Sequence, residues 1–206
     1  MSDFYLASHS ARRVDLLRQV GARFETLLLR SAVPRGPDVA ESMHDGESAL
    51  DYVTRIANEK AEQGVQAVFA RSVLRKPVLS ADTVVVVDGT ILGKPKDAAE
   101  AARFLTLLSG RTHEVFTAVA LALPGTGPTS LWSRLSRSTV TLRAIDAAEV
   151  ARYTATGEPF DKAGGYAIQG RAAIFVEKLE GSYSGVVGLP LAETAALLAR
   201  AGIRLI

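Results

Sequence analysis

The 206-residue chain carries 24 Lys plus Arg against 22 Asp plus Glu, a near balance that gives no basis for nucleic-acid binding. It has no cysteine, which excludes disulfides, thiolate metal sites and cysteine nucleophiles, and its three histidines are too scattered for a histidine-built zinc site. No apolar run approaches the roughly 18 residues of a membrane span and the first residues lack a signal-peptide pattern, so we expect a cytoplasmic protein without a membrane partner.

The length of 206 residues predicts one compact, bilobed domain over residues 1–206. Strand-like and helix-like apolar segments alternate along the chain, which predicts the α/β (mixed α+β) class. The sequence FYLAS predicts a first strand over residues 4–8. Ser10 then offers an N-cap to a helix through ARRVDLLRQV, and Gly21 stands where a helix C-terminus favours glycine.

Arg12 and Arg13 lie in the first turn of this helix, where the helix dipole disfavours cations. They could be solvated surface arginines. Alternatively, the free N–H groups of the helix and the two guanidiniums converge on a bound phosphate, which would offset the unfavourable placement. The sequence leaves both interpretations open.

A second helix is predicted over residues 47–64, ESALDYVTRIANEKAEQG, and Lys60 lies within its inward stripe. The apolar members of that stripe are Leu50, Val53, Ile56 and Ala57. A lysine in this position could extend along the apolar surface to reach water. Taken with the other misplaced cations, it could instead be drawn towards an acidic residue or a polyanion.

The segment LSADTVVVVDGTILGKPKD, residues 79–97, predicts a β-hairpin. Asp88-Gly89 between two apolar runs is a strong turn signal, and a run of four valines suggests a strand covered on both faces.

Three polar residues gather at the other end of this hairpin. Counting back from the turn pairs Thr83 with Lys94 and places Asp82 beside them. Side chains alternate between the faces of a strand, so Asp82 and Lys94 can share one site only if the ladder breaks near Gly93. Asp82 could otherwise be a strand-end aspartate satisfied by a backbone turn.

The rest of the chain continues the alternation of helices and strands. Asp97 as N-cap and Gly110 as stop delimit a helix, and Asp146 with Glu149 caps a shorter helix that ends at Gly157. The remaining expected elements are strands at 113–123 and 136–145 joined by a loop at 124–130, a buried strand at 172–179 and a closing helix at 191–202.

Three familiar catalytic motifs are not supported. GTILGK has the wrong glycine spacing for a P-loop, and GSYSG has Tyr183 where a nucleophile elbow needs serine. HEVFTA lacks the second histidine of a zinc protease.

Four longer segments together resemble the Maf family of nucleoside triphosphate pyrophosphatases: LASHSARRVDLL, SADTVVVVDGTILGKPKD, FLTLLSGRTHEVFTAV and GEPFDKAGGYAIQGRAAIFVEKLEGSYSGVVGLPL. The resemblance runs in order and spacing from Tyr5 to about Thr194. It implies a Maf/ITPase-like fold, with a central mixed sheet flanked by helices and a nucleotide cleft between two lobes. It also implies hydrolysis between the α and β phosphates with a divalent cation, Mg or Mn.

The resemblance also assigns roles by position. Asp82 resembles the catalytic aspartate that activates water, and Glu41 resembles an acidic partner of the metal or of the water, beside Asp82. The residues that resemble the phosphate-gripping cations are Arg12, Arg13, Lys60 and Lys94. These roles agree with the chemistry, because attack on a charged phosphorus needs cations, a metal and a carboxylate.

Within the family, YAIQG and GSYSGVVGLPL are similar to the branch acting on dTTP and UTP, whereas a 7-methyl-GTP branch differs at these places. Thr83, Gln169 and Arg12 match positions associated with that choice. The amide of Gln169 both donates and accepts, which suits a pyrimidine edge, although it could simply bond to its own loop. His9 and Ala11 replace the usual glycine and proline, which implies a looser loop before Arg12 and a reduced or shifted preference.

The sequence therefore predicts an enzyme that hydrolyses dTTP and UTP, and modified analogues, to the monophosphate and pyrophosphate, removing unwanted nucleotides. A nucleotide-binding regulator of cell division with incidental turnover is the rival hypothesis, and 7-methyl-GTP specificity is the rival branch. The expected partner is a small-molecule nucleotide, and a homodimer follows by family analogy alone.

Overall fold

The computed structural model describes residues 2–30, 38–125 and 129–206. The chain divides into two compact units. The first comprises Met1–Asp82, Thr117–Leu135 and Gly188–Ile206, and the second comprises Thr83–Phe116 and Ser136–Val187. Strands β3 (Val78–Val87), β5 (Thr112–Leu123) and β6 (Ser130–Leu142) each contribute residues to both units.

The strands of the described residues form a seven-stranded sheet in the order β2-β1-β3-β5-β6-β7, with β4 paired to β3. Strand β1 (Phe4–Leu6) runs parallel to β2 (Phe24–Thr26) and to β3. Strands β4 (Thr90–Leu92) and β7 (Val176–Glu180) run antiparallel to β3 and β6. The predicted α/β class with a central mixed sheet and helices is confirmed.

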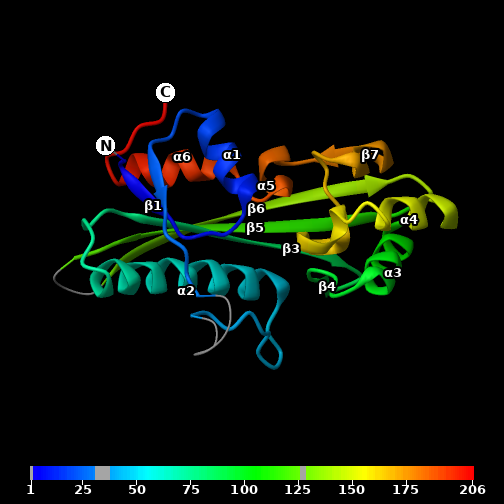
Figure 1. The fold of residues 1–206 in the computed structure, drawn as a ribbon, viewed down its shortest axis with the longest axis horizontal. Helices are drawn as coiled ribbons and strands as arrows, with labels where there is room; N and C mark the ends of the chain where they lie inside the picture. The colour runs from blue at the N-terminus through cyan, green and yellow to red at the C-terminus, as the bar shows by residue number, and fades with distance from the viewer. Residues whose placement is uncertain (1, 31–37, 126–128) are drawn as a thin grey trace. The chain divides into compact units, whose positions relative to one another are not determined.

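Among the residues that the structure describes, three helices belong to the first unit, and they pack on both sides of its strands (Figure 1). Helix α2 (Ala49–Ala70) lies on one side, and α1 (Ala11–Gln19) and α6 (Leu191–Arg200) lie on the other. Ser10 occupies the predicted N-cap position of α1, although its side chain makes no capping hydrogen bond, and Gly21 adopts a positive φ of 68° just beyond the C-terminus.

Helix α2 is longer than predicted, because Gly64 does not end it. A Cβ built on Gly64 would lie 2.5 Å from Cγ1 of Val78, so this glycine permits the helix to approach β3 closely. The helix continues to Ala70, with Val65 and Val68 buried beyond the glycine. No helix within residues 2–30, 38–125 and 129–206, α2 included, is long and apolar enough to cross a membrane.

The predicted hairpin is present, with the predicted register. Asp88 and Gly89 both have positive φ, 48° and 74°, as a type I′ turn requires. The ladder runs from Val87↔Thr90 to Val85↔Leu92 and ends there. The Gly93 carbonyl instead accepts a hydrogen bond from the Gly164 N–H at 3.0 Å, so the break predicted near Gly93 is confirmed.

Two helices of the second unit, α3 (Ala98–Leu108) and α4 (Ala147–Thr154), begin with a side-chain cap. The Asp97 side chain accepts from the Glu100 N–H at 2.8 Å at the start of α3. Asp146 and Glu149 form a complete capping box at the start of α4, as predicted. The two helices pack against each other and against two short 3₁₀ turns, η1 (Glu158–Asp161) and η2 (Ala163–Gly165).

The strand predicted at 172–179 is present only from Val176 onward, and the prediction that it is buried is wrong. Residues Arg171–Phe175 form a 3₁₀ turn, η3, and the strand β7 follows it at the edge of the sheet. Ala172 and Phe175 are buried three residues apart, which suits a 3₁₀ turn, whereas Ile174 is 69% exposed. The helix α5 (Tyr183–Val187) and strand β2 were not predicted, and the centre of the expected 124–130 loop lies outside the described residues.

Candidate active site

Three predicted site residues meet in the first unit. The Lys60 Nζ on α2 lies 2.8 Å from Asp82 Oδ1 on β3 and 2.6 Å from Glu41 Oε1 on the segment that precedes α2. The side chains of Lys60 and Asp82 are only 15% and 12% exposed, whereas Glu41 is 47% exposed. These three residues form what we call the Lys60 cluster.

The packing of α2 on β3 explains why Lys60 reaches Asp82. The Ser80 hydroxyl donates to the Ala57 carbonyl at 2.6 Å inside the core, and Gly64 admits the side chain of Val78. Lys60 lies one helical turn before Gly64, so it faces the same strand further along. Its inward placement, predicted from the stripe on α2, is confirmed, and its ammonium group ends on carboxylates.

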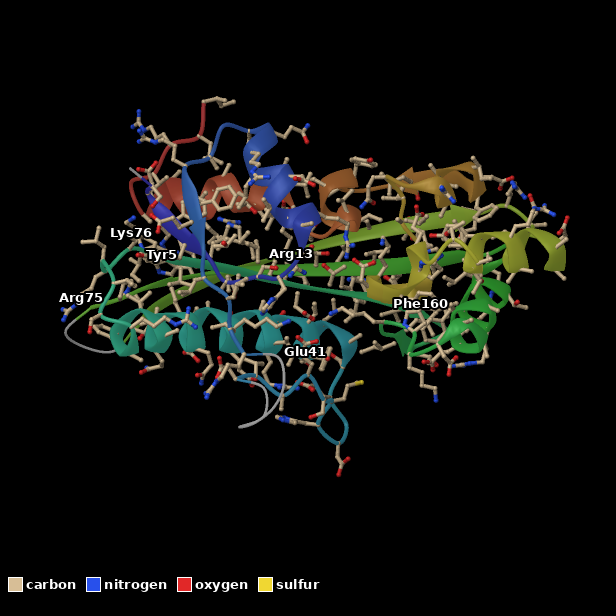
Figure 2. The ribbon with its side chains drawn as sticks, viewed as in Figure 1. Tyr5, Arg13, Glu41, Arg75, Lys76 and Phe160 are labelled. Carbon is tan, nitrogen blue, oxygen red and sulfur yellow. The ribbon has the colours of Figure 1, made fainter. Side chains whose placement is uncertain are left out.

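Arg13 projects from the first turn of α1 and is held by two acceptors. Its Nε donates to the Gly188 carbonyl at 2.7 Å, and its Nη1 donates to the Ser8 hydroxyl at 3.2 Å. Burial lowers the pKa of the Arg13 guanidinium, the Asp82 carboxylate raises it, neighbouring Arg12 lowers it, and Glu41 raises it. An arginine stays charged at neutral pH despite such a shift, so Arg13 adds positive charge that acts on the Asp82 and Glu41 carboxylates. Figure 2 labels Arg13 and Glu41.

Arg12 is half-buried beside Arg13 in the same first turn. The two arginines therefore share the helix N-terminus, as the phosphate interpretation requires. Ser8 is a residue that sequence reasoning missed: it is buried, and its hydroxyl also accepts from the Ser10 N–H at 3.2 Å. The position of Ser8 within the segment LASHSARR was the only sequence signal for a role at the site. Nothing in the sequence indicated that its hydroxyl accepts a hydrogen bond from Arg13.

Tyr52 is a second residue that sequence reasoning missed. Burial is the main cause that raises the pKa of its hydroxyl to about 12, and the Asp82 and Glu41 carboxylates raise it further. The hydroxyl is therefore neutral at physiological pH and lies close to the Lys60 cluster. Tyr52, Ile56 and Lys60 are spaced four residues apart, so they lie on one face of the helix. This spacing is the sequence signal that could have identified Tyr52 as a neighbour of Lys60.

Three predicted substrate-binding residues belong to the second unit. Thr83 is half-buried and directly follows Asp82 on β3. Lys94 is exposed just beyond β4, and Gln169 is exposed in a turn in which the Gly170 N–H donates to the Ala167 carbonyl at 3.0 Å. The structure thus joins Glu41, Lys60 and Asp82 by direct contacts, and the roles of these other residues stay predictions.

The donor set of the Lys60 cluster fits a hard divalent cation. Glu41 and Asp82 offer carboxylate oxygens that already converge on one cation, the Lys60 ammonium. Magnesium is commonly held by one or two carboxylates together with substrate phosphate oxygens. Within the described part of the chain, no group of three or more His, Asp or Glu residues could hold a metal ion, so such a site would need phosphate oxygens or water as further ligands.

The chain is similar over nearly its whole length to several curated proteins. It is 53% identical over 199 residues to a dTTP/UTP pyrophosphatase of Nitrosomonas europaea, covering 97% of this chain and 94% of the relative. A dTTP/UTP pyrophosphatase of Aromatoleum aromaticum is 52% identical over 196 residues, 94% of this chain and 93% of the relative. One of Nitrosospira multiformis is 51% identical over 201 residues, 98% of this chain and 95% of the relative.

The model of the Maf-like protein family matches residues 3–201, which include every residue of the Lys60 cluster and the two arginines of the first turn of α1, Arg12 and Arg13. Together with the identities to the three relatives, this match agrees with the resemblance read from the sequence. The chain belongs to the Maf-like protein family.

Proposed function

We propose that this chain is a nucleoside triphosphate pyrophosphatase that hydrolyses dTTP and UTP to the nucleoside monophosphate and pyrophosphate. The observation that supports this most directly is the 53% identity, over 97% of the chain, to a dTTP/UTP pyrophosphatase. The Lys60 cluster supports it independently, because a carboxylate beside cations is what water attack on a polyphosphate needs.

Asp82 is the proposed catalytic base. Its carboxylate takes a proton from a water molecule as that water attacks phosphorus, and the bond between the α and β phosphates breaks with pyrophosphate leaving. Lys60 holds the Asp82 carboxylate in place at 2.8 Å. A divalent metal bound at Glu41 and Asp82, Mg or Mn, would supply Lewis-acid stabilisation of the phosphate charge.

The cations have a separate task, which is to neutralise negative charge on the polyphosphate. Arg12 and Arg13 offer guanidinium groups at the N-terminus of α1, where a helix also presents backbone N–H groups to anions. Lys60 and Lys94 are the proposed ammonium partners of the phosphates. Pyrophosphate leaves more easily when such charges meet it.

The residues proposed to recognise the nucleobase of the substrate are Thr83, Gln169 and Arg12. An exposed amide such as that of Gln169 can donate to and accept from a pyrimidine edge at once. The proposal includes the two-lobed arrangement with a nucleotide cleft, turnover of modified analogues, a role in removing non-standard nucleotides, a cytoplasmic location and a homodimer.

The test is a panel of triphosphates that contains dTTP, UTP, CTP, GTP and 7-methyl-GTP, each with Mg²⁺ or Mn²⁺, with pyrophosphate release as the readout. We expect release from dTTP and UTP above the other members, and loss of release when EDTA removes the metal. Absence of release from both dTTP and UTP would contradict the proposed specificity. Preference for 7-methyl-GTP would assign the chain to the other branch.

A further inference from the structure

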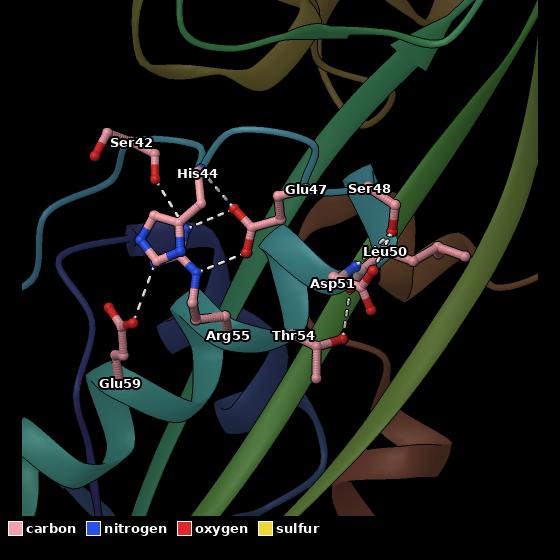
Figure 3. A network of polar contacts seen from close by, with 9 residues as sticks. All are labelled: Ser42, His44, Glu47, Ser48, Leu50, Asp51, Thr54, Arg55 and Glu59. Carbon is pink, nitrogen blue, oxygen red and sulfur yellow. Dashed lines mark hydrogen bonds and ion pairs between the residues drawn. The ribbon is translucent and has the colours of Figure 1, made fainter.

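Arg55 fastens the segment that bears Glu41 to helix α2 (Figure 3). Its Nε and Nη2 donate to the two carboxylate oxygens of Glu47 at 2.6 and 2.8 Å. Nη2 also donates to the Ser42 carbonyl at 2.8 Å, and Nη1 donates to Glu59 Oε1 at 3.1 Å. One guanidinium thus holds both Ser42 and Glu47 against the helix.

The segment is also tied to itself. The His44 N–H donates to Glu47 Oε2 at 3.0 Å, so the carboxylate that receives Arg55 also closes the turn between residues 44 and 47. Glu41 directly precedes Ser42, whose carbonyl is one of the acceptors of Arg55. The path from Arg55 to the Lys60 cluster is therefore one peptide unit long.

The contacts of Arg55 are of the strong, directional kind. The side chains of Arg55 and Glu47 are 20% and 9% exposed, and the two parallel hydrogen bonds match the fork of a guanidinium to a carboxylate. The hydrogen bond from Arg55 is the main cause that lowers the pKa of Glu47 to about 2, so the pair is fully ionised at neutral pH. Arg55 also lies 5.6 Å from the ring centroid of Tyr52.

Glu41 is the most exposed member of the Lys60 cluster. Its side chain is 47% exposed, and residues 38–48 lie outside any helix or strand. A carboxylate on such a segment is held more firmly when the backbone beside it is fastened. Its contact with Lys60, at 2.6 Å, therefore depends on how the segment is held.

We propose that Arg55 is a positioning residue that holds the Glu41 carboxylate against Lys60 and beside Asp82. This inference rests on the proposed function, which gives Glu41 its role near the reacting phosphate. Lysine at position 55 keeps the positive charge but cannot form the two parallel bonds to Glu47 and a third to the Ser42 carbonyl. Arg55→Lys therefore loosens the segment without removing a charge.

The second unit offers a matched control. Arg143 binds Glu149 through two parallel bonds of 2.9 and 2.7 Å, it also donates to the Ile174 and Ala144 carbonyls, and the bond from Arg143 is the main cause that lowers the pKa of Glu149 to about 2. This pair has the same chemistry as Arg55 and Glu47, but its members and the two carbonyl acceptors all belong to the second unit, whereas the Lys60 cluster belongs to the first. Arg143→Lys thus measures the effect of losing two parallel arginine–carboxylate hydrogen bonds away from the Lys60 cluster.

The experiment has one readout that does not depend on turnover. Hydrogen exchange of the metal-free protein, followed by mass spectrometry, reports the protection of backbone amides in residues 41–47. We expect Arg55→Lys to raise exchange there at least about tenfold, whereas Arg143→Lys leaves it unchanged. Equal exchange of this segment in the two variants would overturn the inference.

The second readout is a double-mutant cycle in kcat/KM with dTTP. Arg55→Lys and Glu41→Gln should each lower kcat/KM by about 10- to 100-fold, chiefly through kcat, because outer partners of a metal or phosphate site typically have effects of this size. The double variant should be no worse than Glu41→Gln alone, since Arg55 acts through Glu41. Arg143→Lys should stay within about twofold of the wild type.

The outcomes separate the two hypotheses. If the effects of Arg55→Lys and Glu41→Gln multiply, Arg55 does not act through Glu41 and the inference fails. If Glu41→Gln has no effect on an active wild type, Glu41 has no catalytic role and the inference fails with it. If the wild type releases no pyrophosphate from dTTP or UTP, the proposed function fails, while hydrogen exchange still decides whether Arg55 fixes the segment.

Discussion

Asp82 and Asp88 flank the same run of valines, yet their surroundings differ completely. Asp82 is buried on β3, with its side chain 12% exposed, and meets Lys60 at 2.8 Å. Asp88 occupies the hairpin turn with its side chain 68% exposed, and it pairs with Arg111 at 2.6 Å. The shorter ion pair is thus the more exposed one.

This difference shows that the distance within an ion pair does not measure its importance. Water screens the exposed pair at the turn, so it adds little to stability. At Asp82 the surrounding core raises the strength of every charge interaction, and also the cost of leaving a charge alone. The same amino acid therefore completes an exposed turn at one end of the strand and forms a nearly buried ion pair at the other.

The largest expected effect comes from exchanging each carboxylate for its amide. Asp82→Asn removes the proposed base, and we expect kcat for dTTP to fall by about 10²- to 10⁴-fold. Asp88→Asn keeps the turn, because asparagine also tolerates positive φ, and should leave kcat within about twofold. Steady-state pyrophosphate release by both variants makes this test. Full activity of Asp82→Asn would remove Asp82 from the role of base.

The next largest effect is on the free energy of unfolding, when the cation of each ion pair is replaced by methionine. Lys60→Met leaves the Asp82 carboxylate in a nearly buried position without its ammonium partner, which should destabilise the fold by about 3 kcal/mol. Arg111→Met leaves Asp88 in water and should cost less than about 1 kcal/mol. Urea unfolding of both variants gives the two values. Equal losses would show that burial does not distinguish the pairs.

A double variant isolates the charge from the loss of packing. Lys60→Met with Asp82→Asn leaves no buried carboxylate at position 82, so it should recover part of the stability lost in Lys60→Met alone. If the double variant were as unstable as the two single losses combined, the destabilisation would come from packing instead.

The local chemistry of the sequence predicted the hairpin and the caps well. The Asp88-Gly89 turn fixed the register as far as Val85↔Leu92, because only a type I′ turn suits that dipeptide and the strand twist. The capping box of Asp146 and Glu149 was readable for the same reason, since it joins residues that are close in sequence.

Contacts between distant residues set the limit of prediction. Gly64 has the sequence signature of a helix stop, but its contact with Val78, a residue distant in sequence, gives a packing reason for a glycine inside α2. The anchoring of Arg13 by the Gly188 carbonyl was also unreadable, because a backbone acceptor has no sequence signature. Lys60 was an exception, since its place on the apolar stripe already showed a cation directed inward.

The third expected effect is a dependence of stability on pH, which we predict for the buried His113 and not for the exposed hairpin turn. His113 Nε2 lies 2.7 Å from the Tyr166 hydroxyl, and burial lowers the pKa of His113 to about 4. The unfolded chain binds a proton near its ordinary pKa of about 6.5 while the folded protein does not, so stability is full above that pH and falls as the pH drops to about 4. The decrease should be about 3 kcal/mol.

His113→Gln tests this dependence, because its amide can still bond to the Tyr166 hydroxyl but binds no proton. Urea midpoints at three pH values between 7.5 and 4.5 should fall less steeply for His113→Gln than for the wild type. Arg111→Met serves as the control and should keep the wild-type slope. An unchanged slope in His113→Gln would show that other groups cause the decrease.

The smallest effects come from adding one methyl group in each region. Gly64→Ala places a Cβ 2.5 Å from Val78 Cγ1, and overpacking against a stiff β-branched side chain outweighs the better helix propensity of alanine by about 1–2 kcal/mol. At Gly89 nothing lies within 4 Å of a new Cβ, so Gly89→Ala costs only the left-handed backbone strain of about 1 kcal/mol.

Changing the neighbour separates these two causes. Val78→Ala removes the methyl group that a Cβ at position 64 would meet, so the double variant Gly64→Ala with Val78→Ala should be more stable than the two single losses predict. Gly89→Ala should combine additively with Val78→Ala, because the open space around Gly89 gives strain and no contact. Urea unfolding measures both cycles. Additive losses at Gly64 and Val78 would mean that α2 does not depend on close approach to β3. The contact between Lys60 and Asp82 would then need another structural explanation.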